Sequence, residues 1–147
     1  MGYVEPVAFI SSFHEKQNIM AASFNMFSSI TPFTISIAIQ KKHYTHFQIE
    51  KSNEFVIAFP SEGQESLIRT CSSVSGWQVD KSQFFNMSSA KYVKTQLVNN
   101  CVVNLECKVV NKLDTGSHTI FIGEVVAMYE TIGKRLYHRG GDIYATC

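Results

Sequence analysis

The segment QKKHYT at residues 40–45 concentrates groups that could bind an anion. Its side chains that donate hydrogen bonds or carry positive charge are Lys41, Lys42, His43 and Thr45. The segment lies between an expected strand and an expected helix, and free amides at a helix start favour a bound anion. A terminal phosphate is therefore one candidate ligand. The alternative is that the lysines are solvated in a loop and that Thr45 only caps the helix.

The segment NIMAASF at residues 18–24 is the second candidate, because small side chains predominate in it. Small side chains let the planar ring of a cofactor lie against the backbone and exchange hydrogen bonds with its amides. A tightly packed core strand would have the same composition, since small residues also serve packing. The segment alone leaves both interpretations open.

His118 begins an alternating apolar run directly after the turn DTGS at residues 114–117. Its ring could face the mouth of a pocket, or it could simply be an exposed turn histidine. His43 and His46 lie three residues apart, but no nearby carboxylate completes a zinc site, so we expect no bound metal. The cysteines show no CxxC pair, and buried free thiols are expected at Cys71, Cys101, Cys107 and Cys147.

Most sequence signatures of catalysis are absent. The chain has no GxGxxG after a strand, no phosphate loop ending in GK[ST], no GxSxG elbow and no HExxH. An active site built of side chains alone is therefore not evident. A borrowed cofactor would explain how such a protein does chemistry, because the protein then supplies only a pocket and an orientation.

The elements that position these segments are mostly strands. Residues 6–13 form an apolar run that the polar HEKQN at 14–18 closes, which predicts a hairpin. Residues 33–40, 54–60 and 103–109 alternate with a period of two, as half-buried strands do. The turn Asp114-Thr115-Gly116 leads into the strand HTIFIGEVVAMYE, so two long antiparallel strands are expected.

Three capping spacings predict short helices. They are Thr45-x-x-Gln48, Ser61-x-x-Gln64 and Asp80-x-x-Gln83, the second with a helix that stops near Gly76. Six or so strands with only short helices between them fit a small closed or nearly closed barrel. A parallel sheet fits less well, because parallel neighbours need crossovers of about a dozen residues.

Size and composition restrict the possible partners. A chain of 147 residues with 45% hydrophobic residues predicts one globular domain, residues 1–147. The net charge is +1 and no basic run exceeds Lys41-Lys42, which argues against a nucleic-acid partner. No apolar stretch approaches the roughly 20 residues that cross a bilayer, and the N-terminus lacks the features of a signal peptide. We expect no membrane partner and a cytoplasmic location.

Eight segments extend in chain order across almost the whole sequence: PVAFIS, NIMAASF, SIAIQKKHYT, EFVIAFPS, SGWQVDK, NLECKVV, SHTIFIGEV and LYHRGGDIY. Together they resemble the flavin reductase-like family of FMN-binding split-barrel proteins, which includes flavoredoxin. The most specific are SG-x-x-x-DK at 75–81 and H-T-x-F-x-G-E-V at 118–125. The resemblance implies a mainly β fold, a six-stranded antiparallel Greek-key split barrel with short helices. It also implies a homodimer with FMN near the subunit interface.

The resemblance further implies roles for individual residues. Those along the isoalloxazine ring would be Asn18, Ala22, Ser23 and Phe24. Those at the phosphate would be Lys41, Lys42, His43 and Thr45, with Ser75, Gly76 and Lys81 also at the cofactor. His118 is similar to the family's histidine at the nicotinamide side and is the candidate catalytic residue. Tyr137 and Gly140-Gly141 would close the pocket edge.

The chain also departs from the family pattern. Trp77 falls where many relatives carry arginine, so a bulky ring replaces a charge and could stack at the site or be buried. The stretch between Asn86 and Asn104 is short, and the chain ends soon after GGDIY, where many relatives continue. We expect these differences to open the site and to affect its substrate specificity.

Three functions are compatible with this reading. The leading one is an oxidoreductase in which NADH or NADPH gives hydride to the flavin, which passes electrons to an acceptor such as free flavin, ferric iron or oxygen. The second is a flavoredoxin-like carrier that holds FMN and exchanges electrons with an electron-transfer protein. The third is a flavin-free binding module on the same barrel, because a fold does not determine a function.

Overall fold

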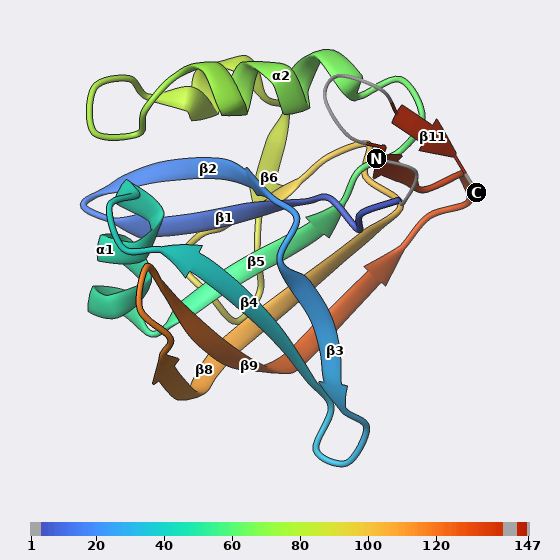
Figure 1. Cartoon of the computed structure of the whole chain (residues 1–147). Coiled ribbons are helices and arrows are strands. Elements are labelled where there is room, and N and C mark those ends of the chain that lie inside the picture. Colours follow the sequence, from blue (N-terminus) through green and yellow to red (C-terminus); the bar gives the residue numbers. More distant parts are fainter. Residues whose placement is uncertain (1–3, 140–143, 147) are drawn as a thin grey trace.

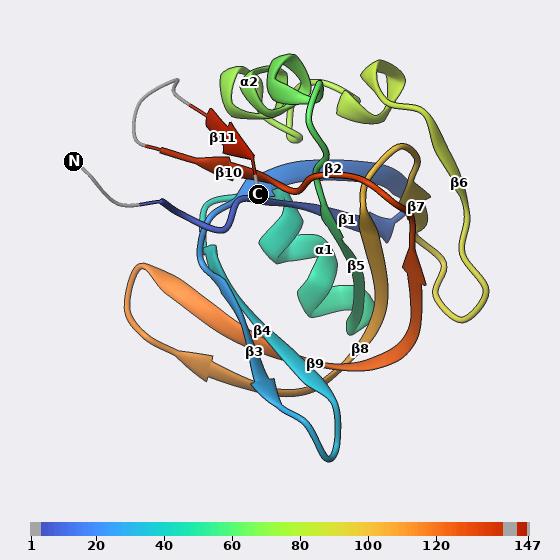
Figure 2. The same cartoon turned by 90° about the vertical axis from the view of Figure 1, so that its right-hand side faces the viewer.

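The computed structural model describes residues 4–139 and 144–146, and its main feature is one antiparallel sheet of seven strands (Figure 1). The strands are ordered β2-β1-β5-β8-β9-β4-β3. Their bounds are Ala8–His14 (β1), Lys16–Ala22 (β2), Asn25–Ser29 (β3), Thr34–Gln40 (β4), Glu54–Phe59 (β5), Val103–Asp114 (β8) and His118–Glu130 (β9). Figure 2 shows the sheet wrapping around an interior, which confirms the predicted barrel-like β fold.

The prediction of six strands was wrong, because the sheet has seven. β3 pairs only with β4 and forms one edge, with a register shift between Phe27 and Ser29. Most of its side chains are exposed or half-buried, so NMFSS shows no alternation that would mark a strand. Two small sheets lie outside the barrel sheet: Met87–Ser89 (β6) with Gln96–Val98 (β7), and Leu136–His138 (β10) with Tyr144–Thr146 (β11).

Both predicted hairpins are present. β1 and β2 pair in full register around Glu15, which has a φ of 67°. β8 and β9 pair across the turn that contains Gly116, whose φ of 114° suits glycine. The β8–β9 ladder shifts register between Glu106 and Cys107 and again between Val109 and Asn111. Such irregularities bend and twist a strand pair, which helps the sheet curl.

Two α-helices and one 3₁₀ helix interrupt the strands. They are Tyr44–Ser52 (α1), Glu65–Ser73 (α2) and Lys81–Phe84 (η1). α1 lies at one end of the barrel and α2 outside the β1–β2 hairpin (Figures 1 and 2). At η1 the predicted Asp80 cap is confirmed, since its carboxylate accepts a hydrogen bond from the Ser82 amide at 3.0 Å.

The other two capping predictions need correction. α1 begins one residue before Thr45, with His43 as its N-cap, and Thr45 instead accepts a hydrogen bond from Asn18. The Gln48 amide donates to the Lys16 carbonyl at 2.7 Å, because packing of α1 on the β1–β2 hairpin buries it. At α2 the Gln64 side chain accepts from the Ser61 amide at 2.9 Å, but Gln64 itself is the N-cap.

Hydrophobic residues form two clusters on opposite faces of β1 and β5. Inside the barrel, Ile35, Ile37 and Ile39 of β4 pack with residues of β5, β8 and β9. On the outer face, Phe9 and Ile19 pack with Ile68 and Cys71 of α2. Both faces of β5 are therefore covered, and all six of its residues are buried.

The predicted buried thiols are confirmed for Cys71, Cys101 and Cys107, which are free and buried. Burial raises the pKa of Cys71 and of Cys101 to about 12, so neither thiol ionises near neutral pH. Cys147 lies outside the described residues. Among the helices in the described part of the chain, none has the length and apolar character to cross a bilayer.

Candidate functional site

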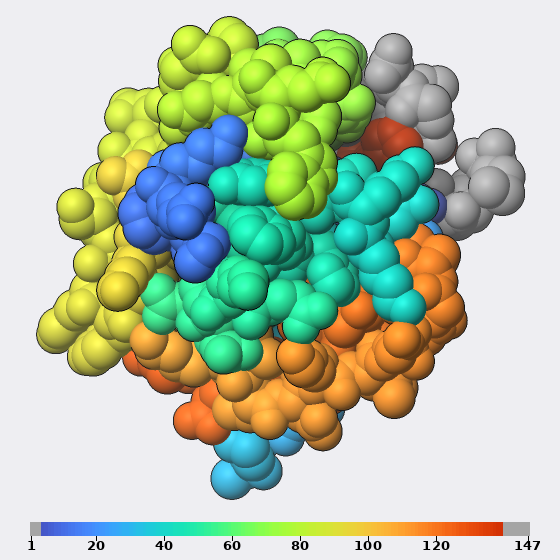
Figure 3. Space-filling model, turned by 90° about the vertical axis from the view of Figure 1, so that its left-hand side faces the viewer, coloured from blue at the N-terminus to red at the C-terminus, as the bar shows by residue number. Residues whose placement is uncertain are grey.

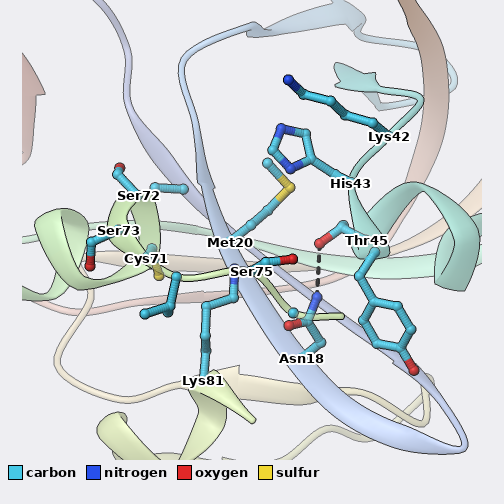
Figure 4. Close-up of a pocket in the computed structure, with 14 residues that line it drawn as sticks. Asn18, Met20, Lys42, His43, Thr45, Cys71, Ser72, Ser73, Ser75 and Lys81 are labelled. Carbon is cyan, nitrogen blue, oxygen red and sulfur yellow. Dashed lines mark hydrogen bonds between the residues drawn. The ribbon is translucent and has the colours of Figure 1, made fainter. Parts of the chain in front are cut away.

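Two adjoining cavities lie beside β2, and one of them is enclosed between the barrel and the segment around α2. The first, called here the polar cavity, has a volume of about 570 Å³. Its lining comes from β2, the start of α1, the end of α2 and η1: Asn18, Met20, Ala21, Lys42, His43, Tyr44, Thr45, Cys71, Ser72, Ser73, Val74, Ser75, Gly76 and Lys81 (Figure 4).

The second, called here the strand cavity, has a volume of about 350 Å³ and lies over β2, β4 and the start of β9. Its lining is Glu5, Met20, Ala21, Ala22, Ser23, Phe24, Ala38, Gln40, His43 and His118. Met20, Ala21 and His43 line both cavities. The two spaces are therefore neighbouring parts of one hollow.

Nearly all predicted site residues meet at this hollow. Those at the polar cavity are Asn18, Lys42, His43, Thr45, Ser75, Gly76 and Lys81. Those at the strand cavity are Ala22, Ser23, Phe24, His43 and His118. Residues far apart in sequence come together here because β4 and β9 are paired and the curl of the sheet brings the end of β2 to β4, where the Ala38 amide donates to the Phe24 carbonyl at 2.9 Å.

Lys41 is the exception, because it lines neither cavity. Its ammonium group lies 2.7 Å from the Asp114 carboxylate, on the side of the loop that faces the β8–β9 turn. Lys41 and Lys42 lie in the turn that follows β4, where the His43 amide donates to the Gln40 carbonyl, and of the two lysines only Lys42 lines the polar cavity. Tyr137, on β10, is likewise absent from both linings, and Gly140-Gly141 lie outside the described residues.

The β4–β9 ladder sets the position of His118 relative to the segment 40–45. Gln40 is the register partner of His118, and the Lys41 amide donates to the Ser117 carbonyl at 3.0 Å. Ser117 Oγ and His118 Nδ1 are 2.7 Å apart, and the Phe24 ring centroid lies 5.4 Å from that of the His118 ring. The ring of His118 is thereby held at the strand cavity.

Lys81 places a buried positive charge in the polar cavity. Its side chain extends from η1 into the cavity beside Cys71 and is only 4% exposed (Figure 4). No carboxylate among the described residues lies within ion-pair distance of its ammonium group. Burial lowers the pKa of Lys81, which is the expected result for an ammonium group without a counter-charge. An anion in the cavity would supply that counter-charge.

His43 is the titratable group that faces both cavities. Its pKa is lowered by burial first, and then by the nearby charges of Lys81 and Lys42. The neutral imidazole is therefore favoured in the free protein. A bound anion would offset the two lysines and let the ring take up a proton, which would add a charge-assisted hydrogen bond.

Asn18 carries an unsatisfied buried atom at the wall of the polar cavity. Its Nδ2 donates to Thr45 Oγ1 at 2.9 Å, as the dashed line in Figure 4 marks, but its Oδ1 has no hydrogen-bond partner. A Cβ on Gly76 would lie 2.6 Å from that oxygen, so the close approach requires glycine. Buried acceptors normally have a donor, so a ligand hydroxyl or N–H would fit here.

Of the two predictions made for Trp77, burial was wrong, and stacking at a bound ligand stays a prediction. Its side chain is 53% exposed, so it is not buried, and it does not line the polar cavity. Instead its ring packs against Tyr44 and Phe47 of α1, and its Nε1 donates to the Lys42 carbonyl at 3.0 Å. The indole thus lies behind the cavity wall.

Several lining residues were missed by the sequence reading. Cys71, Ser72 and Ser73 end α2, and Met20 lies on β2 between the predicted positions. Their types carry no chemical signal, and only the packing of α2 over β2 brings them to the cavity. Within the described ranges, no three His, Cys, Asp or Glu side chains group closely enough to bind a metal ion.

The family model described as flavin reductase like domain matches residues 1–145. The chain belongs to the flavin reductase-like family. This membership agrees with the resemblance carried by SG-x-x-x-DK and H-T-x-F-x-G-E-V, both of which lie at the hollow or lead into it.

Several proteins are similar to this chain over most of its length. An uncharacterized protein of Archaeoglobus fulgidus is 33% identical over 114 residues, which cover 76% of this chain but only 64% of that protein. The flavoredoxin of Methanosarcina acetivorans superposes with a TM-score of 0.91 at 28% identity, covering 99% of this chain and 86% of that one. An FMN-binding protein of Thermus thermophilus, with bound p-hydroxybenzaldehyde, gives 0.91 at 25% identity, with 98% and 86% covered.

Proposed function

We propose that this flavin reductase-like protein binds FMN, with the phosphate in the polar cavity and the isoalloxazine ring along the strand cavity. The observation that supports this most directly is the charge of the polar cavity. Lys42, His43 and Lys81 line it, and none of the described lining residues carries a carboxylate. A cavity lined by two lysines, one of them buried, and by no carboxylate fits an anionic ligand, and phosphate is the anion that FMN offers.

Each part of the lining has a role in this proposal. Lys81, Lys42 and Thr45 would bind the phosphate together with amides at the start of α1. The unpaired Oδ1 of Asn18 would accept a hydrogen bond from the ribityl chain or the ring edge. Ala22 and Ser23, whose small side chains line the strand cavity, would lie along the ring, with Phe24 at its edge.

The reaction that we propose is oxidation of NADH or NADPH. FMN would supply the redox chemistry, taking hydride and passing electrons to free flavin, ferric iron or oxygen. The protein would hold the nicotinamide against the ring, where fixed contact makes the transfer effectively intramolecular. His118 would orient the nicotinamide, since its Nδ1 is engaged by Ser117 and its ring packs near Phe24.

We further propose that the protein is a homodimer in the cytoplasm. Large apolar side chains are exposed around the edge strand β3: Phe24, Met26, Phe27 and Ile30, with exposed fractions of 58%, 67%, 49% and 88%. An apolar edge strand next to the strand cavity is a surface that a second copy would cover. Light scattering at micromolar concentration should give twice the 16.6 kDa chain mass, and a monomer would contradict this part of the proposal.

A second candidate function is electron transfer with a protein partner in place of a nicotinamide. It is favoured by the similarity to a flavoredoxin over 99% of this chain. The two functions differ in a simple measurement. Rapid NADH or NADPH oxidation by the FMN-loaded protein supports the reductase, whereas tightly held FMN that oxidises either nucleotide only slowly supports the carrier.

The first experiment is to incubate the purified protein with FMN, remove free ligand by gel filtration and record the visible spectrum of the protein peak. We expect about one flavin per chain. The same experiment with Lys42→Ala/Thr45→Ala should retain less, because two of the proposed phosphate ligands are gone. A wild-type peak without flavin, together with no binding by equilibrium titration, would leave the flavin-free binding module.

A further inference from the structure

Two segments that are far apart in sequence form opposite walls of the polar cavity. One is the start of α1 with Lys42, His43 and Thr45, and the other is the stretch that leaves α2, with Ser73, Ser75 and Gly76. They belong to different hydrophobic clusters, because Ile49 of α1 packs inside the barrel and Ile68 of α2 packs outside it. Because the two walls pack on separate hydrophobic clusters, core packing alone does not set the distance between them.

Trp77 joins the two walls directly. Its Nε1 donates to the Lys42 carbonyl, which lies 35 positions away in the chain, at 3.0 Å. Its ring centroid lies 4.7 Å from that of Tyr44 and 5.5 Å from that of Phe47, both on α1. Figure 3 shows the yellow-green segment after α2 reaching down onto the start of α1.

The backbone next to Trp77 is held as well. Lys16 Nζ donates to the Gly76 carbonyl at 2.9 Å and lies 4.8 Å from the Tyr44 ring centroid. The Trp77 amide donates to Ser75 Oγ at 3.2 Å. These contacts hold the backbone at Gly76 and Trp77 in place. Because the indole is held there and donates to the Lys42 carbonyl, Trp77 sets the position of that carbonyl.

We propose that Trp77 is a positioning residue for the phosphate end of the flavin, an inference that rests on the proposed function. Trp77 acts through Lys42: its N–H holds the carbonyl of the loop whose side chains and amides face the polar cavity. The lining of the strand cavity includes His43 of this loop but none of Lys42, Tyr44 and Phe47, which Trp77 contacts. Trp77 therefore affects binding of the phosphate more than binding of the ring.

This separation can be measured with two ligands that differ only in the phosphate. FMN and riboflavin share the isoalloxazine ring and the ribityl chain, and both can be titrated by the quenching of their own fluorescence. The test variant is Trp77→Phe, which keeps an aromatic ring against Tyr44 and removes the N–H. Tyr92→Phe is the control, since Tyr92 is a 50% exposed aromatic residue that lines neither cavity.

Loss of one net hydrogen bond that orders the loop should weaken FMN binding about fivefold. We expect riboflavin affinity to change less than twofold in Trp77→Phe, and both affinities to be unchanged in Tyr92→Phe. Equal losses for FMN and riboflavin, or no loss for either, would overturn this inference while leaving the proposed function intact. Absence of flavin binding by the wild-type protein would overturn both.

Discussion

The polar cavity and the strand cavity adjoin at Met20, Ala21 and His43, yet they are built differently. The polar cavity has one wall on the barrel and one on the α2–η1 segment, and it contains the buried ammonium group of Lys81. The strand cavity is lined largely by ends of β2, β4 and β9, whose register is set by ladder hydrogen bonds.

This difference separates binding from reaction. The polar cavity supplies positive charge for an anion and should determine how tightly the cofactor is held. The strand cavity offers small side chains and His118, which lies on the β4–β9 ladder, and should determine how a second ring is oriented. Changes in the first cavity should therefore alter affinity, and changes in the second should alter rate.

The largest effect is expected from Lys81→Met. The substitution removes the buried charge, so FMN affinity should fall about 50-fold, as loss of a charge-assisted hydrogen bond in a buried site predicts. The free protein should gain about 1 kcal/mol in stability, because an unpaired buried ammonium group is costly. Titration with FMN and urea unfolding of the ligand-free protein measure the two quantities.

This interpretation of Lys81 requires that the substitution lowers FMN affinity and raises the stability of the ligand-free protein. A variant that binds FMN as the wild type does would show that the phosphate lies elsewhere. A large loss of stability without ligand would instead show that Lys81 supports the fold. Riboflavin serves as the control ligand, since its affinity should change much less than that of FMN.

Gly76→Ala should have the next largest effect. The added methyl group would meet Asn18 Oδ1 at 2.6 Å, so Asn18 must turn and break its hydrogen bond to Thr45. We expect a loss of about 2 kcal/mol in unfolding free energy, from overpacking and the lost hydrogen bond. Flavin affinity should fall as well, because the unpaired Oδ1 of Asn18 moves away from its position at the cavity wall.

Gly123→Ala is the matched control for that substitution. Its methyl group would lie 2.6 Å from Phe55 in the barrel core, and neither residue lines the polar cavity. It should destabilise the protein at least as much while the folded fraction binds FMN with unchanged affinity. If both variants lose affinity equally, Gly76 has no special relation to the cofactor.

His118→Ala should sharpen the comparison from the side of the strand cavity. We expect NADH or NADPH oxidation to slow about tenfold, which corresponds to one lost polar contact. FMN affinity should change less than twofold, because His118 does not line the polar cavity. Steady-state kinetics with saturating FMN, beside a flavin titration, test this. A loss of FMN affinity with no loss of rate would reverse the assignment.

The smallest expected effect is a dependence of FMN affinity on pH. In the free protein the pKa of His43 is below its ordinary value of 6.5, because of burial, Lys81 and Lys42. A bound phosphate raises this pKa, so binding takes up a proton and becomes tighter as the pH falls. The values pH 8 and pH 6.5 both lie above the second pKa of the phosphate, about 6. Between pH 8 and pH 6.5 we therefore expect FMN affinity to increase roughly threefold.

His43→Gln should remove this dependence, and riboflavin should not show it in either protein. An affinity for FMN that falls as the pH is lowered would contradict the proposed contact between His43 and the phosphate. Fluorescence titration at constant ionic strength is required, because salt screens charge interactions at the mouth of the cavity.

The strands were predictable because their burial repeats every two residues. The alternation at Ile35, Ile37 and Ile39 predicts one core face, and those three side chains are buried together. β3 was not predictable in this way, because it is an exposed edge strand with no buried face, so its sequence does not alternate between apolar and polar residues. The capping prediction for Thr45 was wrong because its hydroxyl accepts a hydrogen bond from Asn18, which lies on β2 and is distant in sequence.

The same distinction explains which site residues could be found. Lys42, His43 and Thr45 stand together in the sequence, so local composition was enough to propose them. Ser72 and Ser73 end a helix that packs over β2, and nothing near them in sequence indicates a cavity. The burial of Lys81 and the hydrogen bond from Trp77 to Lys42 also depend on contacts across the fold.

The position of the two hydrophobic clusters on opposite faces of β1 and β5 has a consequence for motion. Proteins open locally in cooperative units that follow such clusters, and units with fewer buried contacts open more readily. α2 packs only on the outer cluster, whereas β4 and β9 belong to the barrel interior. Amide hydrogen exchange should therefore be faster in α2 and η1 than in β4. A ligand could then enter the polar cavity by partial opening of one wall while the barrel stays folded.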